Sequence, residues 1–276
     1  MQKLNRLGWV VGRSYRCQGV DFGVRANSEE ALQAAVAYLP PRTVETGLPE
    51  VDHLASVRLV AQPRPDAVIR PYHLAYQGRV QTARSFDPRE VLETMEAELA
   101  LVIAEHAVDR LFVHAGVVAL NGQALVLPGK TFTGKSTLVV ELVKRGAVFY
   151  SDEFAVLDST GRVEPYPRRI QIRVGSSGAT ERMTAEDIGG ETGRDPLPVK
   201  LVALCRYRAG AALRLRVLPP GRAALEMVAG TVPVRARPEW SLDILRNVVL
   251  GATVVQGVRG EAGPAADRLL RMLARP

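Results

Sequence analysis

The chain contains, near its middle, the stretch Gly129-Lys130-Thr131-Phe132-Thr133-Gly134-Lys135-Ser136, which Thr137 follows directly. Its spacing fits G-x-x-x-x-G-K-[S/T], with an apolar strand before it and an apolar, helix-opening run after it. Glycines let backbone N–H groups close around phosphate oxygens, and a helix N-terminus adds the positive end of its dipole. We therefore expect residues 129–137 to bind a nucleotide, with Lys135 on the β- and γ-phosphates and Ser136 offering its hydroxyl to Mg²⁺. The alternative is an ordinary glycine turn with a solvated lysine.

Two carboxylates follow the next predicted strand. The run Ala-Val-Phe-Tyr at 147–150 is typical of a buried strand, begins after Gly146, the expected C-cap of the preceding helix, and leads to Ser151-Asp152-Glu153. In α/β nucleotide sites this position carries the metal ligand and the catalytic base. Because adjacent strand residues point to opposite faces, we expect Asp152 and Glu153 to play different roles. A solvated strand end is the alternative.

A predicted β-hairpin delivers the chain into the glycine-rich stretch. Residues 113–120 and 124–127 are apolar strands, and Asn121-Gly122 between them is a strong two-residue turn signal. His114 lies near the start of the first strand. A lone histidine beside apolar residues is more often packed in a core than functional, so its position alone does not decide its role.

The remaining chain is expected to fold as two parts. Residues 1–106 form a mostly β segment with a helix over 28–39, capped by Ser28, and a linking helix over 87–107 that starts at Asp87 and Pro88. The linking helix places Val91, Met95, Leu99, Val102 and His106 on one face.

Residues 107–276 are expected to form a nucleotide-binding α/β unit with some α+β elements. After a surface loop over 175–198, we predict a strand pair over 199–207 and 213–218. Helices over 240–250 and 264–274 are predicted around a strand over 252–258.

Composition narrows the function classes. The 276 residues are 47% hydrophobic with a mean hydropathy of +0.01, as in a folded globular protein. The net charge is +7 (36 basic minus 29 acidic residues), and the arginines are spread along the chain, so nucleic acid is not expected as a partner. Cys17 and Cys205 indicate neither a zinc site nor a disulfide framework, which favours the cytoplasm. No apolar run approaches the ~20 residues of a membrane span, so no membrane anchor is expected.

The histidine, the glycine-rich stretch and the acidic pair recur together in a known family. The segments Val113–Ala119, Asn121-Gly122, Leu125–Thr137 and Tyr150–Glu153 resemble the C-terminal kinase domain of bacterial HPr kinase/phosphorylase. They resemble still more the HPr-kinase-related proteins encoded in peptide-modification gene clusters, some of which phosphorylate a serine of a lasso-peptide precursor. The resemblance covers roughly residues 107–260.

This resemblance implies a fold related to phosphoenolpyruvate carboxykinase, in which a hairpin strand enters a P-loop. It implies a kinase that uses ATP and Mg²⁺ to phosphorylate a serine-type hydroxyl of a peptide or protein. Asp152 would be the base, His114 would lie near the phosphates, and Glu153 with Ser136 would serve the metal. In the similar segment 165–173, Arg168, Arg169 and Arg173 would approach the nucleotide or the acceptor; a solvated strand face is the alternative. Homo-oligomers are compatible with the family, whose members often assemble.

The chain also departs from this pattern. Related loops usually carry glycine where Phe132 stands, so the backbone path must differ there. Residues 1–106 do not resemble the N-terminal domain of true HPr kinases, and HPr itself is not expected as substrate. Two other functions stay open: a kinase of a small hydroxyl compound such as serine or a sugar, and a non-catalytic nucleotide sensor or scaffold. GTP specificity or simple hydrolysis is also compatible with the motif.

Overall fold

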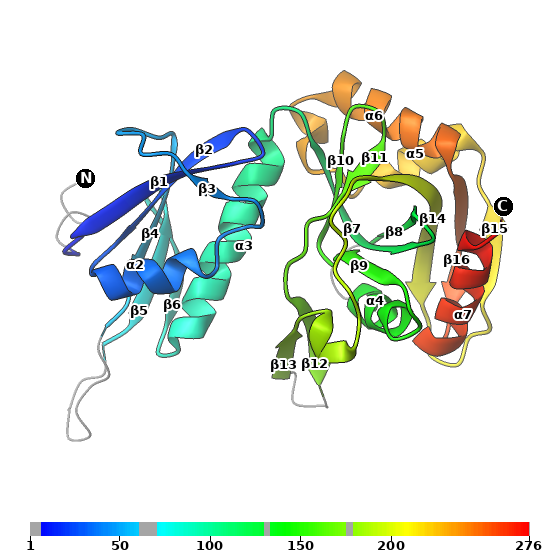
Figure 1. The fold of residues 1–276 in the computed structure, drawn as a ribbon, viewed down its shortest axis with the longest axis horizontal. Coiled ribbons are helices and arrows are strands. Elements are labelled where there is room, and N and C mark those ends of the chain that lie inside the picture. The colour runs from blue at the N-terminus through cyan, green and yellow to red at the C-terminus, as the bar shows by residue number, and fades with distance from the viewer. Residues whose placement is uncertain (1–6, 61–70, 130–132, 175–178, 276) are drawn as a thin grey trace. The chain divides into compact units, whose positions relative to one another are not determined.

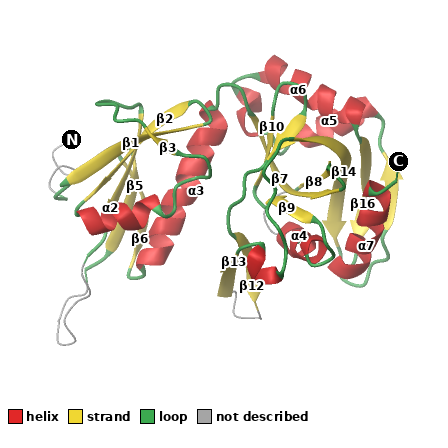
Figure 2. Cartoon of the chain, viewed as in Figure 1, coloured by secondary structure: helices red, strands yellow, loops and turns green. Residues whose placement is uncertain are grey.

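The computed structural model describes residues 7–60, 71–129, 133–174 and 179–275, the side chains of residues 173, 174 and 179 excepted. The chain divides into two compact units, Met1–Val108 and Asp109–Pro276. Each combines helices with sheets, as the element labels in Figure 1 and the colours in Figure 2 show.

The first unit is a six-stranded sheet with two described helices. Its elements are β1 (Val11–Cys17), β2 (Val20–Ala26), α2 (Glu29–Val36), β3 (Val44–Glu45), β4 (His53–Arg58), β5 (His73–Gln77), β6 (Val80–Ser85) and α3 (Pro88–His106). The strand order is β3-β1-β2-β4-β5-β6, with β2 and β4 parallel and the other neighbours antiparallel. The first unit therefore combines a mostly antiparallel sheet with two described helices.

Capping residues set the starts of both helices in this unit, as predicted. Ser28 Oγ accepts a hydrogen bond from the Ala31 N–H at 3.2 Å, and Asp87 Oδ1 accepts one from the Arg89 N–H at 2.8 Å. The buried face of α3 differs from the prediction at its C-terminal end, where Ile103 is buried while His106 is exposed. The helix packs against β4, β5 and β6 of its own unit, because these strands supply the apolar surface that its inner face needs.

The second unit is built on an eight-stranded sheet. Its elements up to residue 188 are β7 (Leu111–Leu120), β8 (Gln123–Pro128), α4 (Lys135–Val143), β9 (Val148–Ser151), β10 (Phe154–Leu157), β11 (Arg162–Glu164), β12 (Ile170–Val174), β13 (Ala179–Met183) and the short helix η1 (Glu186–Ile188). The others are β14 (Leu197–Tyr207), β15 (Arg214–Val217), α5 (Pro220–Val228), η2 (Val232–Arg235), α6 (Pro238–Gly251), β16 (Thr253–Arg259) and α7 (Ala262–Leu273).

Three neighbouring strands of this sheet are parallel and end at the same edge. The order is β11-β10-β7-β8-β14-β16-β15, with β9 also paired to β7. Strands β8, β14 and β16 run parallel, so their carboxyl ends meet at the same edge, where β8 leads toward the glycine-rich stretch. The β7–β8 hairpin turns at Asn121 and Gly122, both with positive φ, which confirms the predicted turn.

Two predictions for the later part of this unit are wrong. Strands β14 and β15 do not pair with each other, because β16 lies between them, parallel to β14 and antiparallel to β15. The segment 175–198 is not wholly a loop, since β13 pairs with β12 and η1 follows. The predicted helices near 240–250 and 264–274 and the strand between them are confirmed as α6, α7 and β16.

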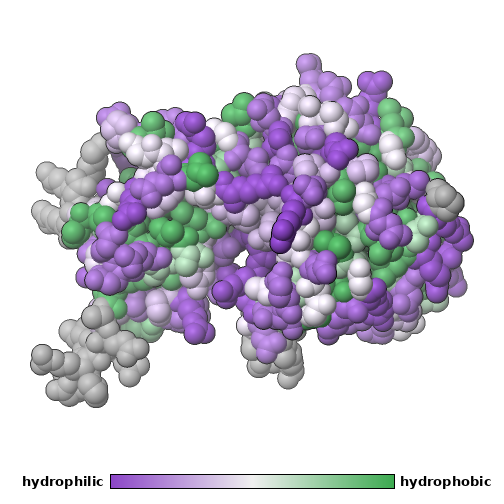
Figure 3. All heavy atoms as spheres, viewed as in Figure 1, coloured by the Kyte–Doolittle hydropathy of each residue, from purple (hydrophilic) through white to green (hydrophobic). Residues whose placement is uncertain are grey.

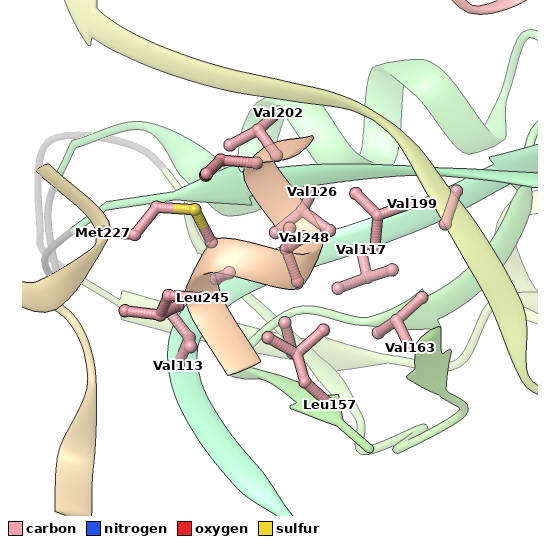
Figure 4. Packing of buried hydrophobic residues seen from close by; sticks show 14 of the residues in the cluster. Val113, Val117, Val126, Leu157, Val163, Val199, Val202, Met227, Leu245 and Val248 are labelled. Carbon is pink, nitrogen blue, oxygen red and sulfur yellow. The ribbon is translucent and has the colours of Figure 1, made fainter. Parts of the chain in front are cut away.

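Each face of the sheet is covered by its own helices. One apolar cluster joins Val117, Val202 and Val254 of the sheet to Met227 of α5 and Leu245 of α6, and Figure 4 shows its central side chains. A second cluster packs the opposite face against α4 and α7. In strands, successive side chains alternate between these two faces, so neighbours such as Val117 and Val118 fall in different clusters.

Figure 3 shows hydrophilic residues over most of the visible face of the second unit, with hydrophobic residues scattered among them. No helix in the described part of the chain combines the length and apolarity needed to cross a bilayer. Cys17 and Cys205 are free thiols, and burial raises the pKa of each to about 11.

Candidate functional site

A strand and a helix flank the glycine-rich stretch. Strand β8 ends at Pro128 and α4 begins at Lys135, which confirms both predicted flanking elements. Gly134 is the N-cap of α4 and has φ +76°, a left-handed conformation that favours glycine. The Gly129 N–H donates to the His114 carbonyl oxygen at 3.2 Å. Lys130, Thr131 and Phe132 lie outside the described residues, so the backbone path at Phe132 stays a prediction.

Lys135 turns back toward the strand that precedes the loop. Its Nζ donates to the carbonyl oxygen of Gly129 at 3.1 Å, and the residue is half-buried. Burial lowers the pKa of Lys135, whereas the nearby Asp152 carboxyl raises it. The Lys135 ammonium therefore contacts the first glycine of the motif and lies near the Asp152 carboxyl.

Asp152 lies in the bend between β9 and β10, next to the start of α4. Its Oδ1 atom is buried and has no hydrogen-bond partner among the described residues. Burial raises the pKa of Asp152 to about 6, although hydrogen bonding from Ser136, the charge of Lys135 and the backbone of Gln171 lower it. A buried carboxyl with a pKa near neutrality and an unused acceptor atom has the properties of a general base.

Gly116 allows these groups to come together. A Cβ on Gly116 would lie 2.6 Å from Val139 Cγ2 and 3.3 Å from Lys135 Cγ, with Asp152 Oδ1 at 3.8 Å. Strand β7 thus passes directly against the first turns of α4 at this residue. We had not singled out Gly116 from the sequence, because a glycine in an apolar strand has many structural explanations.

His114 lies on the same strand, two residues before Gly116. Its ring centroid is 4.6 Å from that of Phe154, its register partner on β10. Burial lowers the pKa of His114, and the positive charge of Lys135 lowers it further. A neutral imidazole beside a buried lysine offers one donor and one acceptor nitrogen at neutral pH.

Glu153 has different surroundings from Asp152, and the different roles expected for the pair stay a prediction. Its carboxylate forms an ion pair with the guanidinium of Arg168, whose side chain is only 9% exposed. Both carboxylates follow β9 in a bend, so the loop conformation, and not strand alternation, separates their directions. Arg169 is exposed, and the side chain of Arg173 is outside the described residues.

Arg259 is a residue of this region that sequence reasoning missed. It is the last residue of β16 and is 2% exposed. Its Nη2 donates to the Gly134 carbonyl oxygen at 2.6 Å, its Nη1 donates to that of Gly260 at 2.9 Å, and its guanidinium lies 5.2 Å from the Tyr207 ring centroid. Only the strand order brings β16 to the edge where α4 begins, so no local motif could have indicated this contact.

The described residues contain no group of three or more His, Cys, Asp or Glu side chains arranged to hold a metal ion. Oxygen donors near Lys135 are the Ser136 hydroxyl and the Asp152 carboxyl, with Glu153 in the same bend. Together with half-buried Lys135 and buried Arg259, these groups suit an anion accompanied by a hard cation more than a metal held by the protein alone.

Comparisons with known proteins give little support to any family. No protein-family model matches the chain, and no curated protein sequence matches it. Among solved structures, the chain is similar to "Structure of the Hpr(Ser) kinase/phosphatase from Coxiella burnetii", at 13% identity and a TM-score of 0.33. That likeness covers 58% of this chain and 93% of the other.

Proposed function

We propose that the chain is a kinase that transfers the γ-phosphoryl group of ATP to a serine-type hydroxyl of a peptide or protein. The observation that carries this proposal is the buried Asp152 carboxyl, with a pKa of about 6, set beside Lys135 and Ser136 at the start of α4. The nucleotide-binding motif alone accounts for phosphate binding, and the nearby carboxyl adds a group that can take the proton of an attacking hydroxyl.

The phosphates would bind where α4 begins. There the free N–H groups of the first turn, the positive end of the helix dipole and the Lys135 ammonium act on the same volume. Lys135 now donates to Gly129, and we expect this hydrogen bond to be exchanged for one to a phosphate oxygen. The sequence motif predicts that Lys130, Thr131, Phe132 and Thr133 would also contact the phosphates, together with Thr137 in the first turn of α4.

The residues present fit a magnesium ion accompanying the nucleotide. Ser136 supplies a hydroxyl and Glu153 a carboxylate that it shares with Arg168. Oxygen donors of this kind are the ones that Mg²⁺ prefers, usually together with phosphates. When bound, the ion would neutralise charge on the phosphates.

Asp152 would take the proton of the acceptor. The hydroxyl oxygen forms a bond to the γ-phosphorus while the bond to the ADP oxygen breaks, and the hydroxyl proton passes to Asp152 Oδ1 before release to water. Neutral His114 would orient a phosphate oxygen or Asp152 through a hydrogen bond. The sequence resemblance supports a peptide serine as acceptor, with Arg168, Arg169 and Arg173 as candidate contacts to phosphate or acceptor.

The nucleotide part of the proposal can be tested without knowing the acceptor. Calorimetric titration of MgATP and MgGTP into the wild type should give micromolar binding, and Lys135→Ala should weaken MgATP binding at least about tenfold. The matched control is Lys144→Ala, an exposed lysine at the other end of α4, which should bind as the wild type does. Equal affinity in all three proteins would refute a phosphate site at Lys135.

A further inference from the structure

An arginine-rich groove lies at the far edge of the second unit's sheet. It has a volume of about 890 Å³ and is lined by Arg206, Arg208, Arg214, Arg216 and Arg222, with Glu226 as its acidic member. All five arginines are exposed. None of the five makes an ion pair with a carboxylate in the described part of the chain; Arg216 Nη2 donates to Gln256 Oε1 at 3.1 Å.

Strand register places these charges together on one face. Arg206 of β14 and Arg214 of β15 are both paired with Val258 of β16, and Arg216 of β15 is paired with Gln256. Directly paired residues on neighbouring strands point to the same face of a sheet, so these side chains share one side. Arg222 reaches the groove from α5, which covers the adjoining part of that face.

The groove also borders a free strand edge. Strand β15 ends the sheet order, and it pairs with β16 alone among the described strands. An edge strand offers a row of unpaired N–H and C=O groups to an extended chain. The arginines beside it therefore surround a place where a polypeptide backbone can add a strand.

The groove lies on the face of the sheet that α5 covers, opposite to α4, but two of its arginines reach the edge where the candidate nucleotide site lies. Arg206 and Arg208 lie at the carboxyl end of β14, and the Arg208 N–H donates to the carbonyl oxygen of Arg259, the residue that contacts Gly134. A chain held along β15 could thus extend past the end of β16 toward α4.

We infer that this groove binds an acidic, extended polypeptide segment. Arginine forks match carboxylate geometry. Within the described part of the chain, the groove presents five guanidinium groups that form no ion pair and only one acidic lining residue, so it selects for negative charge. Single-stranded nucleic acid is less well suited, because its binding sites use aromatic stacking platforms and no aromatic side chain lines this groove. This inference rests on the proposed function. The bound segment would be part of the phosphoryl acceptor, and its acidic residues would lie at a distance from the serine that is phosphorylated.

Fluorescence anisotropy with the full chain and no nucleotide tests the groove directly. The probes are a labelled peptide of alternating Glu and Ser, the same peptide with Lys for Glu, and a poly-dT oligonucleotide of equal length. The Glu-Ser peptide should bind the wild type, and Arg214→Glu with Arg216→Glu should weaken it at least about tenfold through lost contacts and repulsion. The control pair Arg246→Glu with Arg268→Glu, exposed on α6 and α7, changes net charge equally and should leave binding unchanged.

Three results would overturn the inference: no binding of the Glu-Ser peptide to the wild type, equal weakening in both pairs, or tighter binding of the oligonucleotide with loss in the groove pair. Should Arg214→Glu with Arg216→Glu fail to fold, Arg206→Gln with Arg208→Gln repeats the test at the strand end. MgATP titration into the same variants should match the wild type. Anisotropy detects docking even if no acceptor is phosphorylated, so a failed groove and a failed kinase proposal give different results.

Discussion

Arg259 Nη2 donates a hydrogen bond to the carbonyl oxygen of Gly134 at 2.6 Å, which ties the end of β16 to the residue that starts α4. A Cβ on Gly134 would lie 2.5 Å from that same Nη2 atom and would displace it, and the φ of +76° at Gly134 independently favours glycine. A buried cation thus lies directly behind the turn that precedes Lys135. Arg259 therefore both fixes the position of the Gly134 carbonyl and adds positive charge where α4 begins.

Replacing Arg259 should weaken nucleotide binding, although Arg259 lies far along the chain from the glycine-rich motif. Arg259→Met removes both carbonyl contacts and the local positive charge, and loss of a charged hydrogen bond is worth about 1.5–3 kcal/mol, or roughly 10- to 100-fold in MgATP affinity. Calorimetric titration measures the change. Arg271→Met, an exposed arginine on α7, is the control and should bind MgATP normally. Unaltered affinity in Arg259→Met would show that the contact does not support the loop.

The raised pKa of Asp152 predicts a pH-dependent rate. The base must be ionised, so kcat should fall about tenfold per unit as pH drops below about 6 and level off above it. A pH profile of phosphoryl transfer measures this. A flat profile between about pH 5 and 7 would argue against Asp152 as the base.

The same pKa shift predicts that Asp152→Asn stabilises the fold. Because the folded-state pKa is raised above the unfolded value near 4, ionised Asp152 destabilises the native state above about pH 6, and this effect disappears as pH falls toward 4. Asp152→Asn should therefore raise the free energy of unfolding by about 1–3 kcal/mol near pH 8 and by much less near pH 4. Denaturant titrations at both pH values test it, with Asp243→Asn, exposed on α6, as the control. A destabilised Asp152→Asn protein near pH 8 would contradict the assigned burial.

Gly116→Ala should push β7 and α4 apart. The added methyl would lie 2.6 Å from Val139 Cγ2, and a β-branched side chain in a helix has little freedom to move away. We expect a destabilisation of about 1–3 kcal/mol and weaker MgATP binding, because Lys135 lies on the displaced turn. Gly221→Ala in α5, where a Cβ meets no atom within 4 Å, is the control and should be neutral or slightly stabilising. Equal stability of the two variants would place β7 and α4 farther apart than described.

Local signals in the sequence predicted the parts of the fold that local interactions determine. Asp87 before Pro88 marks the start of α3, and Asn121-Gly122 marks the hairpin turn, since both depend on neighbouring residues alone. Strand order depends on pairing between distant segments, and for that reason the position of β16 between β14 and β15 was not predicted.

The candidate site divides in the same way. Lys135 and Ser136 belong to a contiguous motif, and Asp152 follows a strand that the pattern of apolar residues located. The roles of Gly116 and Arg259 arise from contacts across the sheet, which no spacing in the sequence encodes. The arginine groove likewise combines residues from β14, β15 and α5 that are dispersed in the sequence.

Transfer of labelled γ-phosphoryl from ATP to a panel of serine peptides, compared between the wild type and Asp152→Asn, tests the central claim most directly. Free serine, glycerol and sugars are assayed beside the peptides, and MgATP affinity is measured for both proteins. We predict labelled peptide with the wild type, and transfer at least about 100-fold slower in Asp152→Asn with MgATP affinity within about threefold of the wild type. Full transfer by Asp152→Asn, or nucleotide binding by the wild type without transfer to any hydroxyl, would contradict the account.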